Sequence, residues 1–500
     1  MNRIFLSKTG YCNCIQCPKI LWLKKYKREQ AVQKADPAVF ETGKKVGLLA
    51  QDLFGRKHDD IHYNGNYRYM EEKTREYLQN KPNIITEATF NYNNNFCMVD
   101  ILKNDSDGVE IYEVKSSTQV KPIYEDDAAF QYYVLSNMGL NVKKVCIIYI
   151  NNKYIRQKEL NLDELFNIED ITRIVIEKQD EIRNNINIID DFMTKHDRNN
   201  EPDISLGIHC INPYECDFWE YCTRNLPEPN VFDINGGMKY ETKFNKYNEG
   251  IISFEQLQYE KDLNSKYLEQ IDFELNNREP KIDKEAIKEL MNSLKYPLYF
   301  LDYETYFPAI PEFEKTSPYQ HVPFQYSLHI IQEEDAPLEH KQYLAQHDDP
   351  NLIRHFAENL IKDIPEDGSV IIYNKSFEPT RNKEIGEMYP DLKDEMNRIN
   401  DNIIDFQVPF RNRNYYNKEM KGSYSIKQVL PALYPLDASL NYSNLQGIHE
   451  GSQASNAFKN LTNKSPEEQA KIRKQLLEYC KLDTYAMVKI YEKFKEIIEE

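Results

Sequence analysis

The chain has 500 residues, too many for one ordinary domain, and 63 basic against 81 acidic residues give it a net charge of −18. Its 23 Phe and 36 Tyr supply enough core-forming side chains to exclude wholesale disorder. Without a run of about 18 apolar residues or an apolar signal core at its start, we expect a cytoplasmic protein that does not enter a membrane. Taken alone, the charge argues against a nucleic-acid partner.

The charge is unevenly distributed along the chain. Residues 1–150 contain 21 basic and 18 acidic residues, a net charge of +3, while the remaining 350 residues contain 42 and 63, a net charge of −21. The first 28 residues carry seven basic side chains and no acidic one. A local basic surface can bind phosphates even when the whole chain is acidic. The alternative is a solvated helix face.

The first half of the chain predicts helices followed by a small sheet. We expect helices over residues 1–28, 40–54 and 70–79, then three short β-rich runs at 85–95, 96–104 and 108–118. A helix from 125 ends at Gly139, and a further strand covers 142–151. This order indicates an α/β domain with a mixed sheet. Residues 155–200 are charged and predicted to be helical.

A first set of polar residues follows two of the predicted strands. Asp100 ends one strand, and Glu113 and Lys115 share a face of the next because they are two residues apart. Two carboxylates on adjacent strands can hold Mg²⁺ or Mn²⁺, while a lysine orients water or neutralises the transition state. Glu87 could add a ligand, and Gln131 could brace the site. By itself, such a triplet is also ordinary for an exposed strand.

Cysteines form the second set. Cys210, Cys216 and Cys222 recur at intervals of six in a polar segment, and Cys17 lies far upstream. Four thiolates suit Zn²⁺ or an iron–sulfur cluster, whereas a disulfide framework is not expected in an unsecreted chain. The alternative is that these cysteines are small buried apolar residues. Two others in the N-terminal segment could replace Cys17: Cys12 and Cys14.

The order of these residues resembles that of RecB-like PD-(D/E)xK nucleases with an iron–sulfur cluster, a group that includes CRISPR-associated and AddB-type exonucleases. The resemblance covers residues 1–225. It implies that a [4Fe–4S] cluster on the four cysteines clamps the ends of the domain together. Three features differ from the family pattern: no histidine stands in the early helix, Gln131 is not followed by the usual tyrosine four residues on, and the last cysteines are widely spaced.

The second half of the chain predicts a boundary and another sheet. A Pro- and Asn-rich stretch at 225–237 reads as a domain boundary, and residues 253–295 as connecting helices. Strands are expected at 296–306, 324–331 and 368–374. Ser465 and Glu468 form a capping box with Pro466 at the first helical position, so a long final helix begins there.

A third set of residues is spread over this half. Asp302 and Glu304 share a face of an apolar strand, and Tyr479 and Asp483 share a face of the final helix. Glu378 follows another strand. Four acids from three segments could hold two metal ions about 4 Å apart, with the tyrosine positioning water. Each pair alone is common on protein surfaces.

Together, these residues resemble the tyrosine variant of the DEDD-type 3′–5′ exonucleases of the ribonuclease H-like fold, over residues 295–500. The resemblance implies that Asp302 and Glu304 form the first motif, Glu378 belongs to the second, and Tyr479 and Asp483 form the third. Glu378 stands where the family usually has aspartate. In the second motif Asn374 and Phe377 also match. Asp405 is a possible substitute for Glu378, and the resemblance makes Lys421 and Lys427 plausible phosphate contacts.

The predicted architecture is therefore α/β, with a PD-(D/E)xK restriction-endonuclease-like domain (1–225), a helical connector (226–294) and a ribonuclease H-like exonuclease domain (295–500). This pairing also resembles an uncharacterised bacterial family. We expect a Mg²⁺- or Mn²⁺-dependent nuclease with two active sites that acts on DNA ends or single strands, RNA being possible. The alternative is a nucleic-acid-binding or scaffold protein in which one or both sites are inactive.

Overall fold

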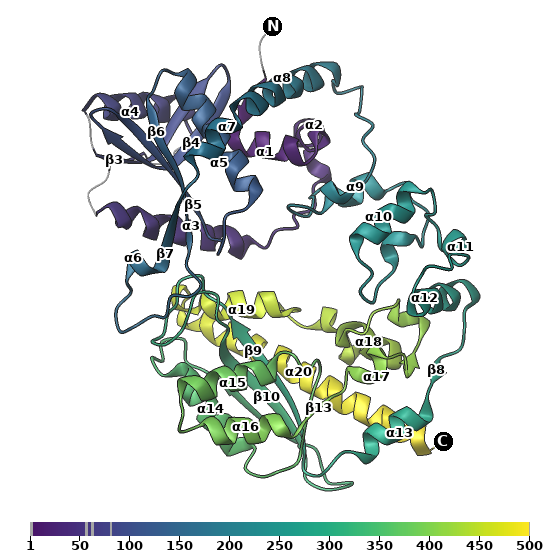
Figure 1. The fold of residues 1–500 in the computed structure, drawn as a ribbon. Helices are drawn as coiled ribbons and strands as arrows, with labels where there is room; N and C mark the ends of the chain where they lie inside the picture. The colour runs from purple at the N-terminus through teal and green to yellow at the C-terminus, as the bar shows by residue number, and fades with distance from the viewer. Residues whose placement is uncertain (1–3, 56–58, 62–64, 81–82, 500) are drawn as a thin grey trace. The chain divides into compact units, whose positions relative to one another are not determined.

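The computed structural model describes residues 4–55, 59–61, 65–80 and 83–499. The chain folds into two compact units, both of them mixed α/β (Figure 1). Unit 1 comprises Met1–Asn225 and Pro308–Gln320, and unit 2 comprises Leu226–Phe307 and His321–Glu500. The segment 226–294 thus belongs to the body of unit 2, and the short segment 308–320 belongs to unit 1.

Unit 1 is built on a mixed sheet in the order β2-β3-β4-β5-β6-β7, with β1 paired to β4. The β3–β4 and β4–β5 pairs are antiparallel. The β5–β6 pair is parallel, and α5 (Pro122–Asn137) supplies the crossover that parallel strands require. The strands are β1 (Leu6–Ser7), β2 (Asp59–Asp60), β3 (Ile84–Tyr92), β4 (Asn95–Asp105), β5 (Gly108–Lys115), β6 (Val142–Ile150) and β7 (Phe166–Asp170).

The two faces of β5 pack against different helices. Val109 and Ile111 lie in the apolar cluster that contains residues of α5 and α8 (Gln179–Lys195). Tyr112 and Val114 lie in a second cluster with residues of α3 (Pro37–Gln51). Alternation along the strand therefore places Glu113 on the α5 side of the sheet, as the sequence predicts.

The prediction of one helix over residues 1–28 is wrong. Residues 1–3 lie outside the described residues, β1 follows, and the rest forms two helices, α1 (Lys8–Gln16) and α2 (Pro18–Tyr26). The helices are separated at Cys17, whose backbone is extended (φ −160°, ψ 117°). A proline disfavours the helical conformation of the residue before it, so Pro18 accounts for the break.

Residues 155–200 are only partly helical. They form α6 (Leu162–Leu165), α7 (Thr172–Glu177) and α8, but between the first two lies β7, which the sequence analysis missed. β7 pairs with β6 at the edge of the sheet, and its last three residues, Ile168, Glu169 and Asp170, are exposed. Such a short edge strand carries little local signal among charged neighbours, so pairing with β6 decides its conformation. The remaining helices of this part are α4 (Tyr67–Asn80) and α9 (Trp219–Thr223).

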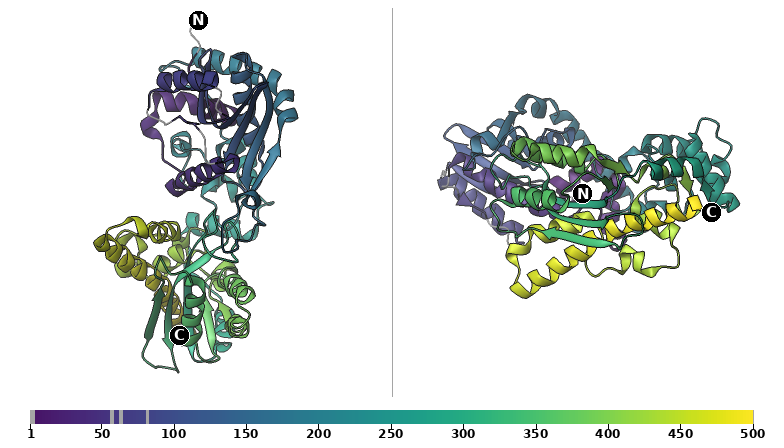
Figure 2. Two further views of the ribbon diagram at one scale, coloured as in Figure 1. Left: turned by 90° about the vertical axis from the view of Figure 1, so that its left-hand side faces the viewer. Right: turned by 90° about the horizontal axis from the view of Figure 1, so that it is seen from below.

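Unit 2 is built on a five-stranded sheet in the order β11-β10-β9-β12-β13. α20 (Pro466–Glu499) and α19 (Gly451–Lys459) cover one face, and α14 (Leu352–Asp363), α15 (Glu378–Met388) and α16 (Lys393–Asp401) cover the other (Figures 1 and 2). The strands are β9 (Leu298–Tyr306), β10 (Val322–Ile331), β11 (Glu339–Leu344), β12 (Ser369–Ile372) and β13 (Ile403–Asp405).

The rest of unit 2 surrounds this sheet. A two-stranded ribbon joins β8 (Lys281–Ile282) to β14 (Tyr415–Tyr416). The predicted capping box is confirmed, since Ser465 N donates to Glu468 Oε2 (3.0 Å) and Glu468 N donates to Ser465 Oγ (3.4 Å). The remaining helices are α10 (Tyr240–Asn248), α11 (Phe254–Leu257), α12 (Ser265–Asn276), α13 (Lys284–Asn292), α17 (Val408–Arg411) and α18 (Ile426–Leu433).

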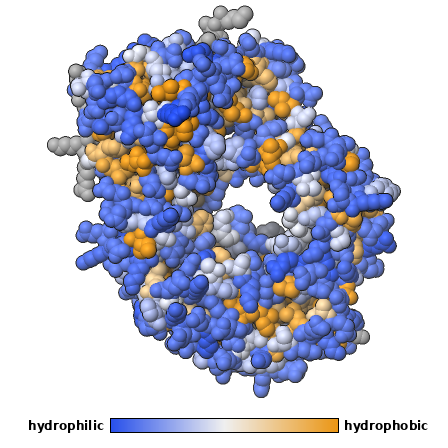
Figure 3. All heavy atoms as spheres, in the orientation of Figure 1, coloured by the Kyte–Doolittle hydropathy of each residue, from blue (hydrophilic) through white to orange (hydrophobic). Residues whose placement is uncertain are grey.

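Polar side chains dominate the face shown in Figure 3, where apolar residues appear in scattered groups. Throughout the described residues, no helix combines the length and the apolar character needed to cross a bilayer.

Candidate functional site

The residues predicted in unit 1 converge beside the end of β5. Glu113 Oε1 accepts a hydrogen bond from Lys115 Nζ (2.7 Å), and Glu113 Oε2 accepts one from Gln131 Nε2 of α5 (2.7 Å). The Asp100 carboxylate accepts from the backbone N–H of Val114 (2.7 Å). Side chains from β4, β5 and α5 thus surround Glu113, which is 2% exposed.

Two residues that the sequence analysis missed complete this group. Lys8, at the start of α1, donates to Glu113 Oε1 (2.8 Å) and lies 3.5 Å from Asp127 Oδ1. Asp127 of α5 also pairs with Lys115 Nζ. Asp127 carried a sequence signal, because it precedes Gln131 by one helical turn. Lys8 is 105 residues from Glu113, and no spacing rule connects them.

The charges of this group shift the pKa values of its acids in opposite directions. Burial alone would raise the pKa of Glu113, but the adjacent Lys115 and Lys8 outweigh it and lower that pKa. Burial and the negative charge of Glu113 raise the pKa of Asp100 to about 7. The pKa values of Lys8 and Lys115 are both raised, because the carboxylates around them outweigh their burial. The two lysines therefore neutralise a buried carboxylate pair.

Glu87 lies at the margin of this group. Its backbone is left-handed (φ 55°), a conformation that costs a non-glycine residue about 1–2 kcal/mol, and burial raises its pKa. Oxygen atoms of Glu87, Asp100 and Glu113 do not all lie within 4.8 Å of one another. The buried Gln131 Oε1 has no hydrogen-bond partner. In this arrangement Lys8 and Lys115 occupy the Glu113 Oε1 that a divalent ion would otherwise share.

The four predicted cysteines lie near one another in unit 1. Cys17 occupies the break between α1 and α2, and Cys222 lies in α9. Cys216 N donates to the carbonyl of Cys210 (2.9 Å), and Gln16 Nε2 of α1 donates to the carbonyl of His209 (2.8 Å). The Pro18 break thus positions the upstream cysteine, and α1 is tied to the loop that carries the others.

Electrostatic coupling identifies which thiols are neighbours. Burial, together with the charges of the other three cysteines of the set, raises the pKa of Cys210 to about 12. No three of these four sulfur atoms lie within 4.8 Å of one another. The thiol of Cys12 is instead affected by the charges of Asp127, Lys115 and Lys8, and that of Cys14 by Cys17. Neither substitutes for Cys17 in the arrangement observed.

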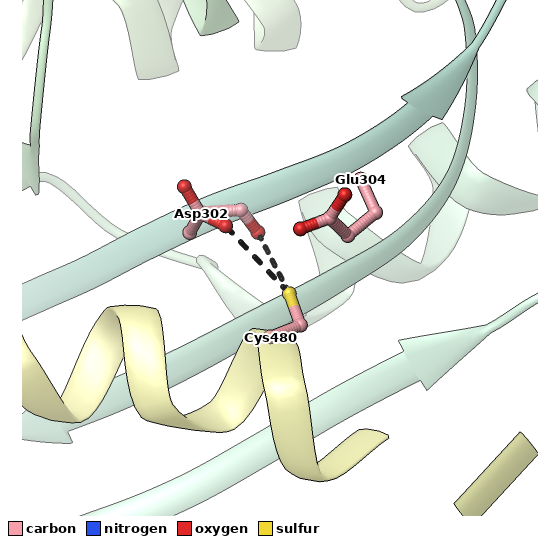
Figure 4. A group of neighbouring side chains, drawn as sticks. All are labelled: Asp302, Glu304 and Cys480. Atoms are coloured by element: carbon pink, nitrogen blue, oxygen red, sulfur yellow. Dashed lines mark hydrogen bonds between the residues drawn. The ribbon is translucent and has the colours of Figure 1, made fainter. Parts of the chain in front are cut away.

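In unit 2, the predicted first motif faces the final helix. Asp302 and Glu304 lie on β9, and Cys480 of α20 lies opposite them (Figure 4). One ligand atom from each of these three residues lies within 4.8 Å of the others, the one such set of three or more acids, cysteines or histidines in the described part of the chain. Cys480 Sγ is 3.8 Å from Asp302 Oδ2 and 3.8 Å from the Asp302 carbonyl.

Further carboxylates crowd this set. The charges of Asp483 and Glu378 add to burial in raising the pKa values of Asp302 and Glu304 well above their usual range. Burial raises the pKa of Glu378 to about 8 and that of Asp483 to about 6. Glu378 is 3% exposed, and its Oε2 has no hydrogen-bond partner. Carboxylates packed together in this way disfavour ionisation unless a cation joins them.

A lysine and two tyrosines border the carboxylates. Lys427 Nζ of α18 donates to Tyr479 Oη (3.2 Å) and to the carbonyl of His449 (2.8 Å). Burial raises the pKa values of Glu304 and Asp483, and the positive charge of Lys427 offsets part of that rise. The sequence analysis missed Tyr442, which donates to Asp483 Oδ1 (2.6 Å). Lys421, by contrast, ends a 3₁₀ turn where its carbonyl accepts from Asn235 Nδ2.

Asp405 does not take the place of Glu378. Its carboxylate accepts hydrogen bonds from the backbone N–H groups of Asn374 (3.0 Å) and Gln407 (2.9 Å). Asn374 has a positive φ of 91°, so these bonds stabilise a strained turn after β12. Asp405 therefore supports the loop that leads to Glu378, and Glu378 itself interacts with Asp302 and Glu304.

One comparison with known proteins falls on unit 2. A family model described as a domain of unknown function (DUF2779) matches residues 299–425, a range that includes Asp302, Glu304 and Glu378 but ends before α20. The uncharacterised protein UU173 of Ureaplasma parvum serovar 3 is 27% identical over 269 residues, which are 48% of this chain and 37% of that protein. The alignment therefore spans well under two thirds of the relative's length. No solved structure matches.

Proposed function

We propose that unit 2 is a metal-dependent exonuclease site that hydrolyses phosphodiester bonds at the ends of nucleic-acid strands. The observation that carries the proposal is the set of buried carboxylates on β9, α15 and α20, together with the unpartnered Glu378 Oε2. Oxygen donors in this density are what Mg²⁺ and Mn²⁺ prefer. In addition, the order of these acids along the chain resembles the DEDD pattern.

Each residue has a role in this proposal. Asp302, Glu304, Glu378 and Asp483 would hold the ions, which when bound would supply a nucleophilic hydroxide and neutralise charge on the phosphate. Tyr479 orients the attacking water, and Lys427 keeps the tyrosine hydroxyl in place. Tyr442 fixes the orientation of Asp483. Lys427 also offers its positive charge to a substrate phosphate.

For unit 1, we propose a PD-(D/E)xK site served by Asp100, Glu113 and Lys115, beside a [4Fe–4S] cluster on Cys17, Cys210, Cys216 and Cys222. The order of the four cysteines along the chain resembles that of the iron–sulfur nucleases and favours a cluster over a single zinc ion. The mutual effects of these thiols on the pKa of Cys210 support their being neighbours.

The test is a nuclease assay on the purified full chain with Mg²⁺ or Mn²⁺. Single-stranded DNA, double-stranded DNA and RNA, each labelled at either end, distinguish substrate and polarity. Lys115→Ala and Asp302→Ala, assayed in parallel, should each remove part of the activity. Lys362→Ala, on the far-side helix α14, is the matched control and should retain it. No cleavage of any substrate with either ion would refute the proposal.

A second role is favoured for unit 1 alone. Glu113 Oε1 already accepts from Lys8 and Lys115, so the positive charge that a metal would bring is partly supplied by the protein. This arrangement favours a site that binds strands without cleaving them. In that case, Lys115→Ala lowers salt-sensitive affinity for DNA and leaves the cleavage rate at saturating DNA unchanged.

A further inference from the structure

The final helix brings a thiol into the carboxylate site of unit 2. Cys480 follows Tyr479 and precedes Asp483 by three residues, so it lies on the face of α20 that packs on β9. Its side chain is fully buried. Figure 4 shows the sulfur pointing at Asp302 and lying beside the Glu304 carboxylate.

The distances match a single bound ion. Cys480 Sγ and Asp302 Oδ2 are 3.8 Å apart. A tetrahedral ion with bonds of about 2.3 Å to sulfur and 2.0–2.2 Å to oxygen separates two such ligands by about 3.6 Å. The third ligand atom, from Glu304, lies within 4.8 Å of both. Small side-chain movements would therefore bring all three onto one ion.

A second, independent observation points to a cation here. Glu378 is 3% exposed, its Oε2 has no partner, and its charge acts on both Asp302 and Glu304. A buried carboxylate oxygen without a donor is costly unless a cation or a proton reaches it. Glu378 thus adds a nearby negative charge that would attract a cation to the set, although its oxygens do not lie within 4.8 Å of all three ligand atoms.

We propose that Asp302, Glu304 and Cys480 form a mixed oxygen–sulfur site for a thiophilic divalent ion, such as Zn²⁺, which competes with the Mg²⁺- or Mn²⁺-bound form of the same carboxylates. Binding forms a metal–sulfur bond and breaks the S–H bond, and the proton leaves to the buffer. Thiolate ligands select Zn²⁺ and Co²⁺ over Mg²⁺, which demands oxygen. This inference rests on the proposed function only where it concerns competition, since the ion can bind whether or not the chain cleaves nucleic acid.

Co²⁺ is the probe, because a thiolate bound to it produces a charge-transfer band in the near ultraviolet. The full chain is titrated with CoCl₂ and compared with Cys480→Ser and with Cys146→Ser, a control at an equally buried cysteine of β6. Cys17, Cys210, Cys216 and Cys222 of unit 1 are present in all three proteins and contribute the same background to their spectra. We expect a band component equal to one thiolate per chain that is lost in Cys480→Ser and retained in Cys146→Ser. In Cys480→Ser, the affinity for Zn²⁺, measured in competition with Co²⁺, should be at least about tenfold lower than in the wild type.

Two other variants keep the test independent of the cysteine substitution. Asp302→Asn and Glu304→Gln retain the thiol but remove a carboxylate ligand, and each should abolish the same component. If Cys480→Ser fails to fold by circular dichroism, these variants decide: loss of the component supports the site, and its retention overturns it. An unchanged spectrum in folded Cys480→Ser also overturns it. An inactive chain that still shows the component refutes the nuclease proposal but not the mixed site.

Discussion

The two carboxylate sites of this chain solve the same electrostatic problem in opposite ways. In unit 1, Lys8 and Lys115 contact Glu113 directly, and its pKa is lowered. In unit 2, Lys427 stands at the margin, and the pKa values of Asp302 and Glu304 are raised well above their usual range. The first site carries its own counter-charges, whereas the second requires protons or metal ions. This contrast teaches that buried acids alone do not identify a metal site, since the cations around them decide what they bind.

Asp302→Asn provides the largest expected effect. Loss of a metal ligand should slow metal-dependent cleavage by unit 2 on the order of 10³-fold, because bound ions contribute several kcal/mol to charge stabilisation. The same change relieves repulsion, so the metal-free chain should melt at a higher temperature in EDTA. Asp367→Asn, at an exposed acid of unit 2, is the control. A lower melting temperature in EDTA would contradict the account of this site.

Cys216→Ser tests whether the four clustered cysteines stabilise unit 1 and leave the stability of unit 2 unchanged. Metal binding by structural cysteines is coupled to folding, so unit 1 should lose on the order of several kcal/mol of stability. Limited proteolysis should then digest residues before 225 while the fragment containing α20 resists. The wild-type preparation should be brown and the variant colourless. Equal protection of unit 1 in Cys216→Ser and in the control Cys146→Ser would be the contrary result.

The pH dependence of stability should differ between the sites. Glu378 has a pKa of about 8 in the folded protein against an ordinary 4.5, so the folded state binds more protons between these values. The free energy of unfolding of metal-free unit 2 should therefore fall as pH rises from about 4.5 to 8. Glu113 has a lowered pKa, so its contribution is present above 4.5 and is lost as pH falls.

Denaturant unfolding of the metal-free chain over this pH range measures the difference. Glu378→Gln should flatten the slope for unit 2, because the amide does not titrate. Mn²⁺ should flatten it as well by stabilising the ionised form. A slope for unit 2 that is unchanged by both would show that Glu378 does not govern it.

Lys8→Met tests the counter-charge of unit 1. Removal of one partner of a buried carboxylate should lower the free energy of unfolding of unit 1 by about 1–3 kcal/mol, since Lys115 still pairs with Glu113. The matched change Lys24→Met, at an exposed position of α2, should cost less than about 0.5 kcal/mol. Equal effects of the two substitutions on the free energy of unfolding would show that Lys8 does not stabilise the site.

Tyr479→Phe should have the smallest effect. It deletes the hydroxyl that Lys427 holds and should lower the turnover of unit 2 about tenfold, equivalent to about 1.4 kcal/mol. The Mn²⁺ concentration for half-maximal activity should not change, because the carboxylate ligands remain. Tyr259→Phe, at an exposed tyrosine, is the control. A changed Mn²⁺ requirement would assign the tyrosine to metal binding instead.

Local patterns predicted much of the fold. The alternation of β3 to β5 and of β9, the helix around Gln131 and the capping box at Ser465 all follow from short-range rules and are confirmed. The break at Cys17 had a signal in Pro18 that the single-helix prediction overlooked. β7, β11 and β13 were missed, because short or polar edge strands depend on their neighbours in the sheet.

The candidate sites were predictable where residues share a strand or a helix turn. Glu113 with Lys115, and Tyr479 with Asp483, have such spacings. Cys480 had the same signal, since it precedes Asp483 by three residues on one helix face, but it is not among the ligands predicted from the sequence. In contrast, sequence spacing could not predict the long-range partners, which are Lys8, Lys427 and Tyr442. Only tertiary packing places these residues beside the acids.

The segment Pro308–Gln320 makes unit 1 discontinuous in sequence. Its Ala309 lies in the apolar cluster with Tyr154, and Tyr319 donates a hydrogen bond to the carbonyl of Ser116, the residue after Lys115. During synthesis, a nascent chain of 225 residues therefore lacks part of the unit it will form, and that unit is completed only after residue 320 has left the ribosome. A fragment cut at the apparent boundary would leave this cluster uncovered. Dissection of the protein into separately expressed halves thus needs residues 308–320 supplied to the first half, for example by fusion through a linker.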